Sequence, residues 1–183
     1  RGRIMVQEDR NSLLFWYPKI QDVALTPRTE WYLTPDPDCG YDLIGEGDGE
    51  WTAWWEEHVP FIRRLAMQFG FPCFMKTDVF SGKHSWKDTC YVPDPESVIP
   101  HLRQLMSDSL TCDFMGLPTR AIVFREYLPL YALFKAFWGH MPIGRERRYF
   151  IRDGHVEAHF PYWPADAIRE HDPDDAGWET LLA

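Results

Sequence analysis

The segment 146–160, ERRYFIRDGHVEAHF, constrains the fold more than any other part of the chain because it has the pattern of a β-hairpin. Asp153-Gly154 lies between two runs of alternating character, and this dipeptide favours the two-residue type I′ turn, in which both positions have a positive φ. Pairing outward from the turn predicts these cross-strand neighbours: Ile151 with Val156 and Tyr149 with Ala158 on one face, and Phe150 with Glu157 and Arg148 with His159 on the other. We expect the first face to pack on a core and the second, with Glu146 beyond it, to form a charged surface.

Two further segments have helical periodicity. Residues 51–69 place apolar and aromatic side chains on one helix face, with Gly70 as the stop and with Pro60 expected to kink or split the helix. The members of this face are Trp51, Trp54, Trp55, His58, Val59, Ile62, Leu65, Ala66 and Phe69. A second helix is predicted to begin with Asp94 as its N-cap and Pro95 at its first position. Its apolar stripe consists of Val98, Ile99, Leu102, Leu105 and Met106.

The remaining segments read mostly as strands and loops. FPCFMKTD (71–78) is predicted to be a strand with period-2 alternation. Its two faces are Phe74, Lys76 and Asp78 on one side and Cys73, Met75 and Thr77 on the other. The other predicted segments are short extended pieces within 13–33, a loop over 34–50, a loop over 80–88, a return strand at 89–92, a central strand at 121–130, a strand at 133–138 and the start of a helix at 174–183. This order predicts an α+β fold with mostly antiparallel sheets.

Composition limits the classes of partner. The chain has 183 residues and a net charge of -9, with 45% hydrophobic residues and nine tryptophans, which indicates one well-packed domain or two small lobes. An acidic chain has no general attraction for nucleic acid or anionic lipid, so neither is an expected partner. The four cysteines form no CxxC pair and are expected to be reduced, and no apolar run approaches a membrane span. These features predict a cytoplasmic protein.

Two lysines are candidate ligands for an anion. Lys76 lies inside an apolar strand, where its charge is costly unless the ammonium reaches water or an anion, and snorkelling from an edge strand is the simpler alternative. The sequence Ser81-Gly82-Lys83-His84 follows, and a small glycine-containing loop allows backbone N–H groups to approach phosphate oxygens. This loop lacks the spacing of a Walker A motif, and a turn with an exposed lysine explains it equally well.

Charged residues in two predicted strands are further candidates. Arg125 and Glu126 interrupt the apolar segment IVFREYLPL and must point to opposite faces, so one of them is expected to face a cleft. Arg148 has the planar guanidinium that grips phosphate through two N–H groups, and Glu146 suits a ribose hydroxyl or a metal ion. A surface network of cross-strand ion pairs is the alternative for these two residues. We find no triad spacing for nucleophilic catalysis and no zinc-ligand spacing.

Together, these motifs resemble the ATP-grasp superfamily, in which two lobes clamp ATP between antiparallel sheets. The resemblance rests on FMKTD, SGKHSW, VFREYLPL and ERRYFIRDGHV in this order, with LLFWYPKI and TPRTEW near the start, and it covers roughly residues 14–163. The chain is most similar to two groups: the cell-division-cycle family that assists assembly of a translation initiation factor, and a related bacterial and phage clade named for two arginines and one lysine.

The resemblance implies both an architecture and a site. Residues 1–120 would form an N-terminal lobe with the Trp-rich helix and a phosphate-covering loop, and residues 121–183 would form a hinge strand and a partial C-terminal lobe. Lys76 would contact the α and β phosphates, Ser81–His84 would cover them, and Arg148 would bind the polyphosphate. The hinge beside adenine would consist of Arg125, Glu126, Tyr127 and Leu128, and Glu146 would hold the ribose or the hinge side.

Three functions follow as expectations. The first is an ATP-dependent, ligase-type enzyme that activates a carboxylate as an acyl phosphate and uses Mg²⁺ to bridge the phosphates. The second is a non-catalytic ATP-binding protein that grips a protein partner, and the third is a small acidic domain without a nucleotide. The acidic residues Asp172, Asp174 and Asp175 have the pattern of a helix-start loop rather than that of metal ligands.

Overall fold

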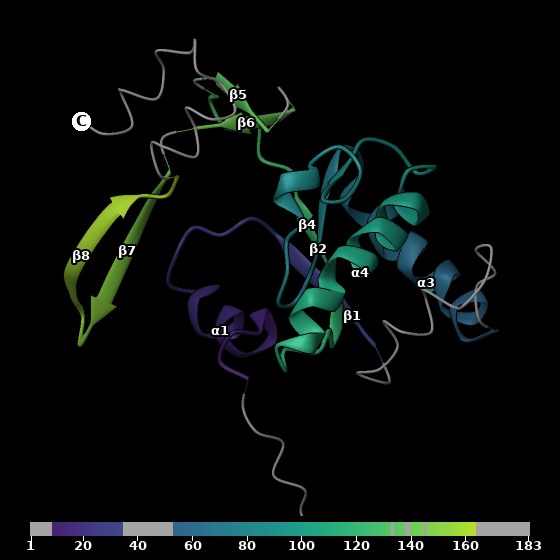
Figure 1. Cartoon of the computed structure of the whole chain (residues 1–183), viewed down its shortest axis with the longest axis horizontal. Coiled ribbons are helices and arrows are strands. Elements are labelled where there is room, and N and C mark those ends of the chain that lie inside the picture. The colour runs from purple at the N-terminus through teal and green to yellow at the C-terminus, as the bar shows by residue number, and fades with distance from the viewer. Residues whose placement is uncertain (1–8, 35–52, 133, 138–139, 145, 164–183) are drawn as a thin grey trace, which may run out of the picture. The chain divides into compact units, whose positions relative to one another are not determined.

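The computed structural model describes residues 9–34, 53–132, 134–137, 140–144 and 146–163 (Figure 1). The chain forms two compact units, Arg1–Leu128 and Pro129–Ala183. The fold is α+β, and every sheet in the described residues is antiparallel. Nearly all of the predicted loop at 34–50, the predicted helix start at 174–183 and the three aspartates at 172–175 lie outside the described residues.

The first unit contains a four-stranded sheet in the order β1-β4-β2-β3 (Figure 1). Its elements are α1 (Leu13–Ile20), β1 (Thr29–Leu33), α3 (Ala53–Phe69), β2 (Cys73–Thr77), the short 3-10 helix η1 (Lys83–Ser85), β3 (Tyr91–Val92), α4 (Val98–Phe114) and β4 (Ala121–Glu126). β4 pairs with β1 on one side and with β2 on the other. β4 is an interior strand of this sheet, and it lies within the compact unit that ends at Leu128.

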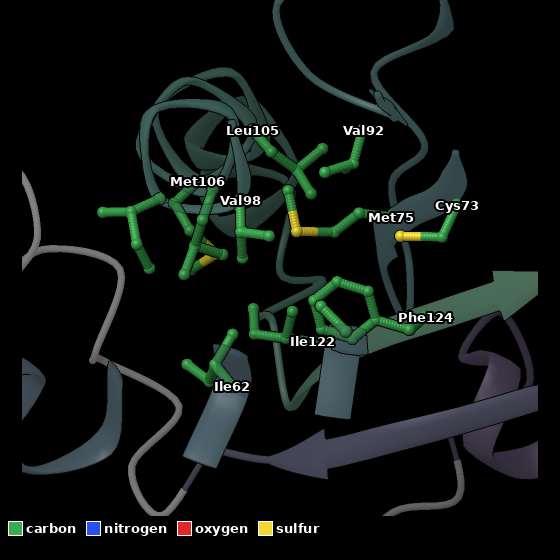
Figure 2. Close-up of a cluster of buried hydrophobic side chains, with 12 residues drawn as sticks. Ile62, Cys73, Met75, Val92, Val98, Leu105, Met106, Ile122 and Phe124 are labelled. Carbon is green, nitrogen blue, oxygen red and sulfur yellow. The ribbon is translucent and has the colours of Figure 1, made fainter. Parts of the chain in front are cut away.

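The two faces of this sheet are covered by different helices. In β2, the residues Cys73, Met75 and Thr77 are buried, whereas Phe74 and Lys76 are partly exposed, which confirms the predicted alternation. The buried side of β2 and β4 packs against α3 and α4, and Figure 2 shows this cluster. Its members include Ile62, Met75, Val98, Leu105, Met106, Ile122 and Phe124. On the opposite face, Leu13 and Tyr17 of α1 pack against Ala121 and Val123 of β4.

α1 differs from the sequence prediction, which placed short extended pieces here. Ser12 caps the helix by accepting a hydrogen bond from the backbone N–H of Leu14 (3.2 Å). The Ser12 hydroxyl donates to the Asp78 carboxylate (2.6 Å), and the N–H of Leu13 donates to the Asp78 carbonyl (2.8 Å). The first turn of α1 is therefore fixed by a residue far away in the sequence, and local periodicity gave no sign of it.

The two longer helices pack most described members of their predicted apolar faces in or against the core, but each differs from the prediction at one point. The side chains of Trp51, Trp54 and Trp55, which were predicted on the face of α3, lie outside the described residues. α3 continues unbroken through Pro60, and Gly70, with φ of 71°, ends it as predicted. Ile62 and Ala66 are fully buried on the sheet side of α3, and this packing supports the helix after the proline. α4 begins at Val98, later than predicted, because Asp94 instead closes a turn by accepting from the N–H and hydroxyl of Ser97.

The second unit consists of two hairpins in its described residues. β5 (Phe134–Ala136) pairs with β6 (Met141–Ile143), and β7 (Arg147–Arg152) pairs with β8 (His155–Pro161). The predicted turn is confirmed, since Asp153 and Gly154 have φ of 49° and 79°. The predicted strand at 121–130 ends at Glu126, and the strand predicted at 133–138 is described over Phe134–Ala136.

The pairing within β7 and β8 departs from the prediction. Ile151 faces Val156 as expected, but the register shifts between Phe150 and Ile151. This shift gives the following partners: Phe150 with Ala158, Tyr149 with His159 and Arg148 with Phe160. The other predicted pairings are therefore wrong, because the irregularity adds a residue to one strand. All of β7 is exposed, so the expected separation into a core face and a charged face is also wrong.

Candidate functional site

Lys76 occupies the face of β2 that points away from the α3–α4 core. Burial lowers the pKa of its ammonium to about 8, and the positive charges of Arg125 and Lys83 act in the same direction, while Asp78 opposes them. Within the described part of the chain, Lys76 makes no hydrogen bond and no ion pair. The first unit thus holds a largely buried ammonium whose charge the nearby Asp78 offsets only in part.

Arg125 reaches the same face from the neighbouring strand. Phe74 pairs with Arg125 and Lys76 pairs with Val123, so Arg125 lies diagonally across the sheet from Lys76. Burial lowers the pKa of the Arg125 guanidinium, and its Nε donates to the hydroxyl oxygen of Thr29 (3.1 Å). A neutral hydroxyl, not a carboxylate, is therefore its hydrogen-bond partner, and its charge adds to that of Lys76.

The loop after β2 brings Lys83 close enough to depress the pKa of Lys76. This loop is a fixed turn: the Thr89 hydroxyl lies 2.7 Å from the Gly82 carbonyl oxygen and 2.8 Å from that of Ser85. Gly82 has φ of 60°, and a Cβ there would lie 2.8 Å from the Thr89 hydroxyl oxygen. The loop therefore holds Lys83 at a defined position, whereas its predicted neighbours Ser81 and His84 are half-buried and exposed, respectively.

Four aromatic side chains adjoin this group of cations, and sequence reasoning singled out only one of them, Tyr127, as a site residue. Trp86 stacks on Tyr91 (ring centroids 5.6 Å apart, 15° between planes) and lies 5.8 Å from Phe74. Tyr127 contacts Tyr91 edge to face at 5.3 Å. Phe74 precedes Lys76 by two positions in β2 and therefore shares its face, so the alternation of that strand could have indicated Phe74 as a site residue, although not Trp86 or Tyr91.

Two residues of the predicted hinge lie apart from the cations. Glu126 is exposed and pairs with Cys73, which places it on the opposite face of the sheet from Arg125. Its carboxylate accepts a hydrogen bond from the backbone N–H of Arg28 (3.4 Å). Leu128 is 42% exposed and is the last residue of the first unit. Of the predicted hinge residues, Arg125 and Tyr127 therefore lie beside the cation group.

Glu146 and Arg148 belong to the second unit. The Glu146 carboxylate accepts from the indole N–H of Trp163 (3.4 Å), and the Arg148 guanidinium lies over the ring of Tyr162, 4.8 Å from its centroid. The backbone N–H of Tyr162 in turn donates to the Glu146 carbonyl (2.8 Å). These contacts hold Glu146 and Arg148 against neighbouring aromatic side chains of the second unit. Their role as ligands of a nucleotide remains a prediction.

Two other kinds of feature are absent from the described residues. Among them, histidine, cysteine, aspartate and glutamate side chains nowhere gather in groups of three suited to a metal ion. None of the described helices combines the length and the hydropathy needed to cross a membrane. Comparisons of the chain with protein-family models, with curated proteins and with solved structures gave no match.

Proposed function

We propose that this protein binds ATP and that Lys76, Lys83 and Arg125 hold its phosphates. The observation that carries the proposal is the buried ammonium of Lys76, which has no partner among the described residues and lies near two further cations. A buried charge is retained at a cost in stability unless something compensates it, and a polyanion supplies that compensation. Phosphoryl groups need positioning and charge neutralisation, which lysine and arginine side chains provide.

The aromatic cluster supports a nucleotide rather than inorganic phosphate alone. Trp86, Tyr91 and Tyr127 are partly exposed and adjoin the cations. Aromatic rings contribute about 1–3 kcal/mol for each stacked base in nucleic-acid complexes. A ligand with a base at one end and phosphates at the other would use both parts of this surface.

The finer proposal is an ATP-grasp-like, ligase-type enzyme, with Glu146 and Arg148 as further predicted ligands of the nucleotide. Mg²⁺ would be bound mainly through the phosphates, as it is in many nucleotide sites. An ATP-binding protein that grips a protein partner without catalysis is the alternative. Release of ADP and phosphate that depends on an added carboxylate and amine supports the enzyme, whereas ATP binding without turnover supports the alternative.

The direct test is calorimetric titration of the whole chain with ATP, with and without Mg²⁺. A ligand at about 100 times its Kd stabilises a protein by about 2.7 kcal/mol, so thermal unfolding provides a second measurement. We expect Lys76→Ala and Arg148→Ala each to abolish the ATP-induced increase in Tm while leaving the protein folded. Lys87→Ala, at an exposed lysine of the same loop, is the matched control and should retain the increase.

The two variants test different parts of the proposal. Loss of the ATP effect in Lys76→Ala alone would retain the phosphate site in the first unit and reject the contribution of Arg148. An unchanged ATP effect in both variants would reject the site altogether.

A further inference from the structure

A small cavity lies between the second half of α3 and the turn that precedes α4. Its volume is about 210 Å³, and it is partly open to solvent. The lining residues are Arg63, Met67, Phe71, Pro95, Glu96 and Val98. Val98 also belongs to the core cluster that covers the buried face of β2 (Figure 2), whereas Lys76 lies on the other face. The cavity is therefore separate from the proposed ATP site.

This cavity has an apolar floor, and its volume is about that of one large side chain. Val98 is buried at its base, Phe71 is half-buried beside the core, and Met67 is 65% exposed. A cavity of about 150 Å³ holds a benzene ring, so a volume of this size accepts a large aliphatic or aromatic side chain. Burial of such a side chain here would remove apolar surface of both partners from water.

The rim carries two opposite charges from different elements. Arg63 belongs to α3, and Glu96 belongs to the turn before α4. Both are exposed, and within the described residues neither side chain forms an ion pair or a hydrogen bond. Asp94 in the same turn differs, because its carboxylate accepts two hydrogen bonds from Ser97. Arg63 is thus available to a carboxylate, and Glu96 is available to an ammonium group.

We propose that this cavity binds a free α-amino acid with a large apolar side chain, with its carboxylate on Arg63 and its ammonium on Glu96. In a free amino acid the ammonium group, the carboxylate group and the side chain are all attached to Cα. One small molecule can therefore fill the apolar floor and pair with both charged residues of the rim. An internal residue of a peptide lacks both charges and would leave Arg63 and Glu96 without partners.

The test is titration of the whole chain with L-leucine and L-phenylalanine, followed by calorimetry or by NMR shifts. We expect binding of both, weaker binding of L-alanine, and loss of binding for N-acetyl-L-phenylalanine amide, which keeps the side chain but has neither charge. Arg63→Gln and Glu96→Gln should each raise Kd at least about tenfold, since each removes a charge-assisted hydrogen bond. Arg64→Gln is the matched control, because Arg64 is the exposed neighbour of Arg63 and does not line the cavity.

Three results would overturn this site. They are the absence of binding at millimolar concentrations of both amino acids, equal binding of the uncharged amide, and an unchanged Kd in both rim variants. The second result would favour a peptide segment as the occupant. ATP titration of Arg63→Gln and Glu96→Gln should match that of the unmodified chain, so failure of either proposal leaves the other open to its own test.

Discussion

Lys76 shows how a single residue opposes stability. Its ammonium is largely buried beside Arg125 and Lys83, and its pKa of about 8 means that the folded chain disfavours the charged form. At neutral pH the charge is nevertheless present in both the folded and the unfolded chain, so folding includes the cost of burying it. We therefore expect Lys76 to serve the proposed ligand site rather than the stability of the fold.

We therefore expect Lys76→Met to raise the free energy of unfolding at pH 7 by roughly 1–3 kcal/mol, because an apolar side chain replaces a buried charge. Between about pH 8 and the ordinary lysine pKa of 10.5, the unfolded chain binds more protons than the folded one, so the stability of the unmodified protein rises with pH through this range. The advantage of Lys76→Met should accordingly shrink across it.

Urea unfolding of both proteins at a series of pH values from 7 to 10.5 measures this difference. Lys87→Met serves as the control, because Lys87 is exposed and its replacement should leave stability nearly unchanged at every pH. A Lys76→Met protein less stable than the unmodified chain at pH 7 would contradict the assignment of Lys76 as a charge that its neighbours offset only in part.

Among the elements, the turn around Gly82 has the most direct influence on the candidate site, because it determines where Lys83 lies. It joins β2 to β3 and positions Lys83, and Thr89 fixes it through the carbonyl groups of Gly82 and Ser85. A side chain at position 82 would meet Thr89 at 2.8 Å and a methyl group of Leu105 at 3.0 Å, in a backbone conformation that side chains disfavour. Position 82 therefore requires glycine for two independent reasons.

We predict that Gly82→Ala lowers the free energy of unfolding by more than about 2 kcal/mol, since overpacking adds to the cost of the left-handed backbone. Gly70→Ala is the matched control: Gly70 also has a positive φ, but a Cβ there would meet nothing within 4 Å. Its replacement should cost only about 1 kcal/mol. Equal losses in the two variants, measured by chemical unfolding, would show that the contact with Thr89 is unimportant.

The sequence predicted those elements that depend on local periodicity. The alternation of β2, the apolar stripe of α4 and the turn at Asp153-Gly154 were all correct, because each pattern lies within a few neighbouring residues. α1 was wrong because its first turn depends on Asp78, 66 positions from Ser12. The register of β7 and β8 was wrong beyond Ile151 because nothing in the alternation indicates an added residue.

The sequence predicted only part of the candidate site, as it predicted only part of the fold. Lys76 and Arg125 stand out as charges inside apolar strands, and the structure brings them together with Lys83. Trp86 and Tyr91 did not stand out, because their contact depends on how the loop folds back beside β2. The roles of Glu146 and Arg148 as nucleotide ligands remain predictions.

At the scale of the whole molecule, β4 determines where the first unit ends. It is hydrogen-bonded to β1 and to β2, so its loss would leave β1 without a partner in the sheet and β2 paired only with β3. The unit boundary after Leu128 follows from this topology.

We expect a chain shortened to residues 1–128 to fold and unfold cooperatively, since it keeps all four strands of this sheet and the core that packs on it. A chain shortened to residues 1–120 should lack a cooperative transition, because it has no β4. Circular dichroism and thermal unfolding of the two chains test this difference. Cooperative folding of the 1–120 chain would contradict the interior position of β4.

The alternating burial along β2 predicts which substitutions would affect stability and which would affect ligand binding. Cys73 and Met75 belong to the core cluster and Thr77 is fully buried, whereas Phe74 and Lys76 face the candidate site. A library that varies each position should therefore give two alternating phenotypes along five consecutive residues. Changes at the core positions would lower the amount of protein in cells, and changes at the other two would yield abundant protein that has lost its ligand.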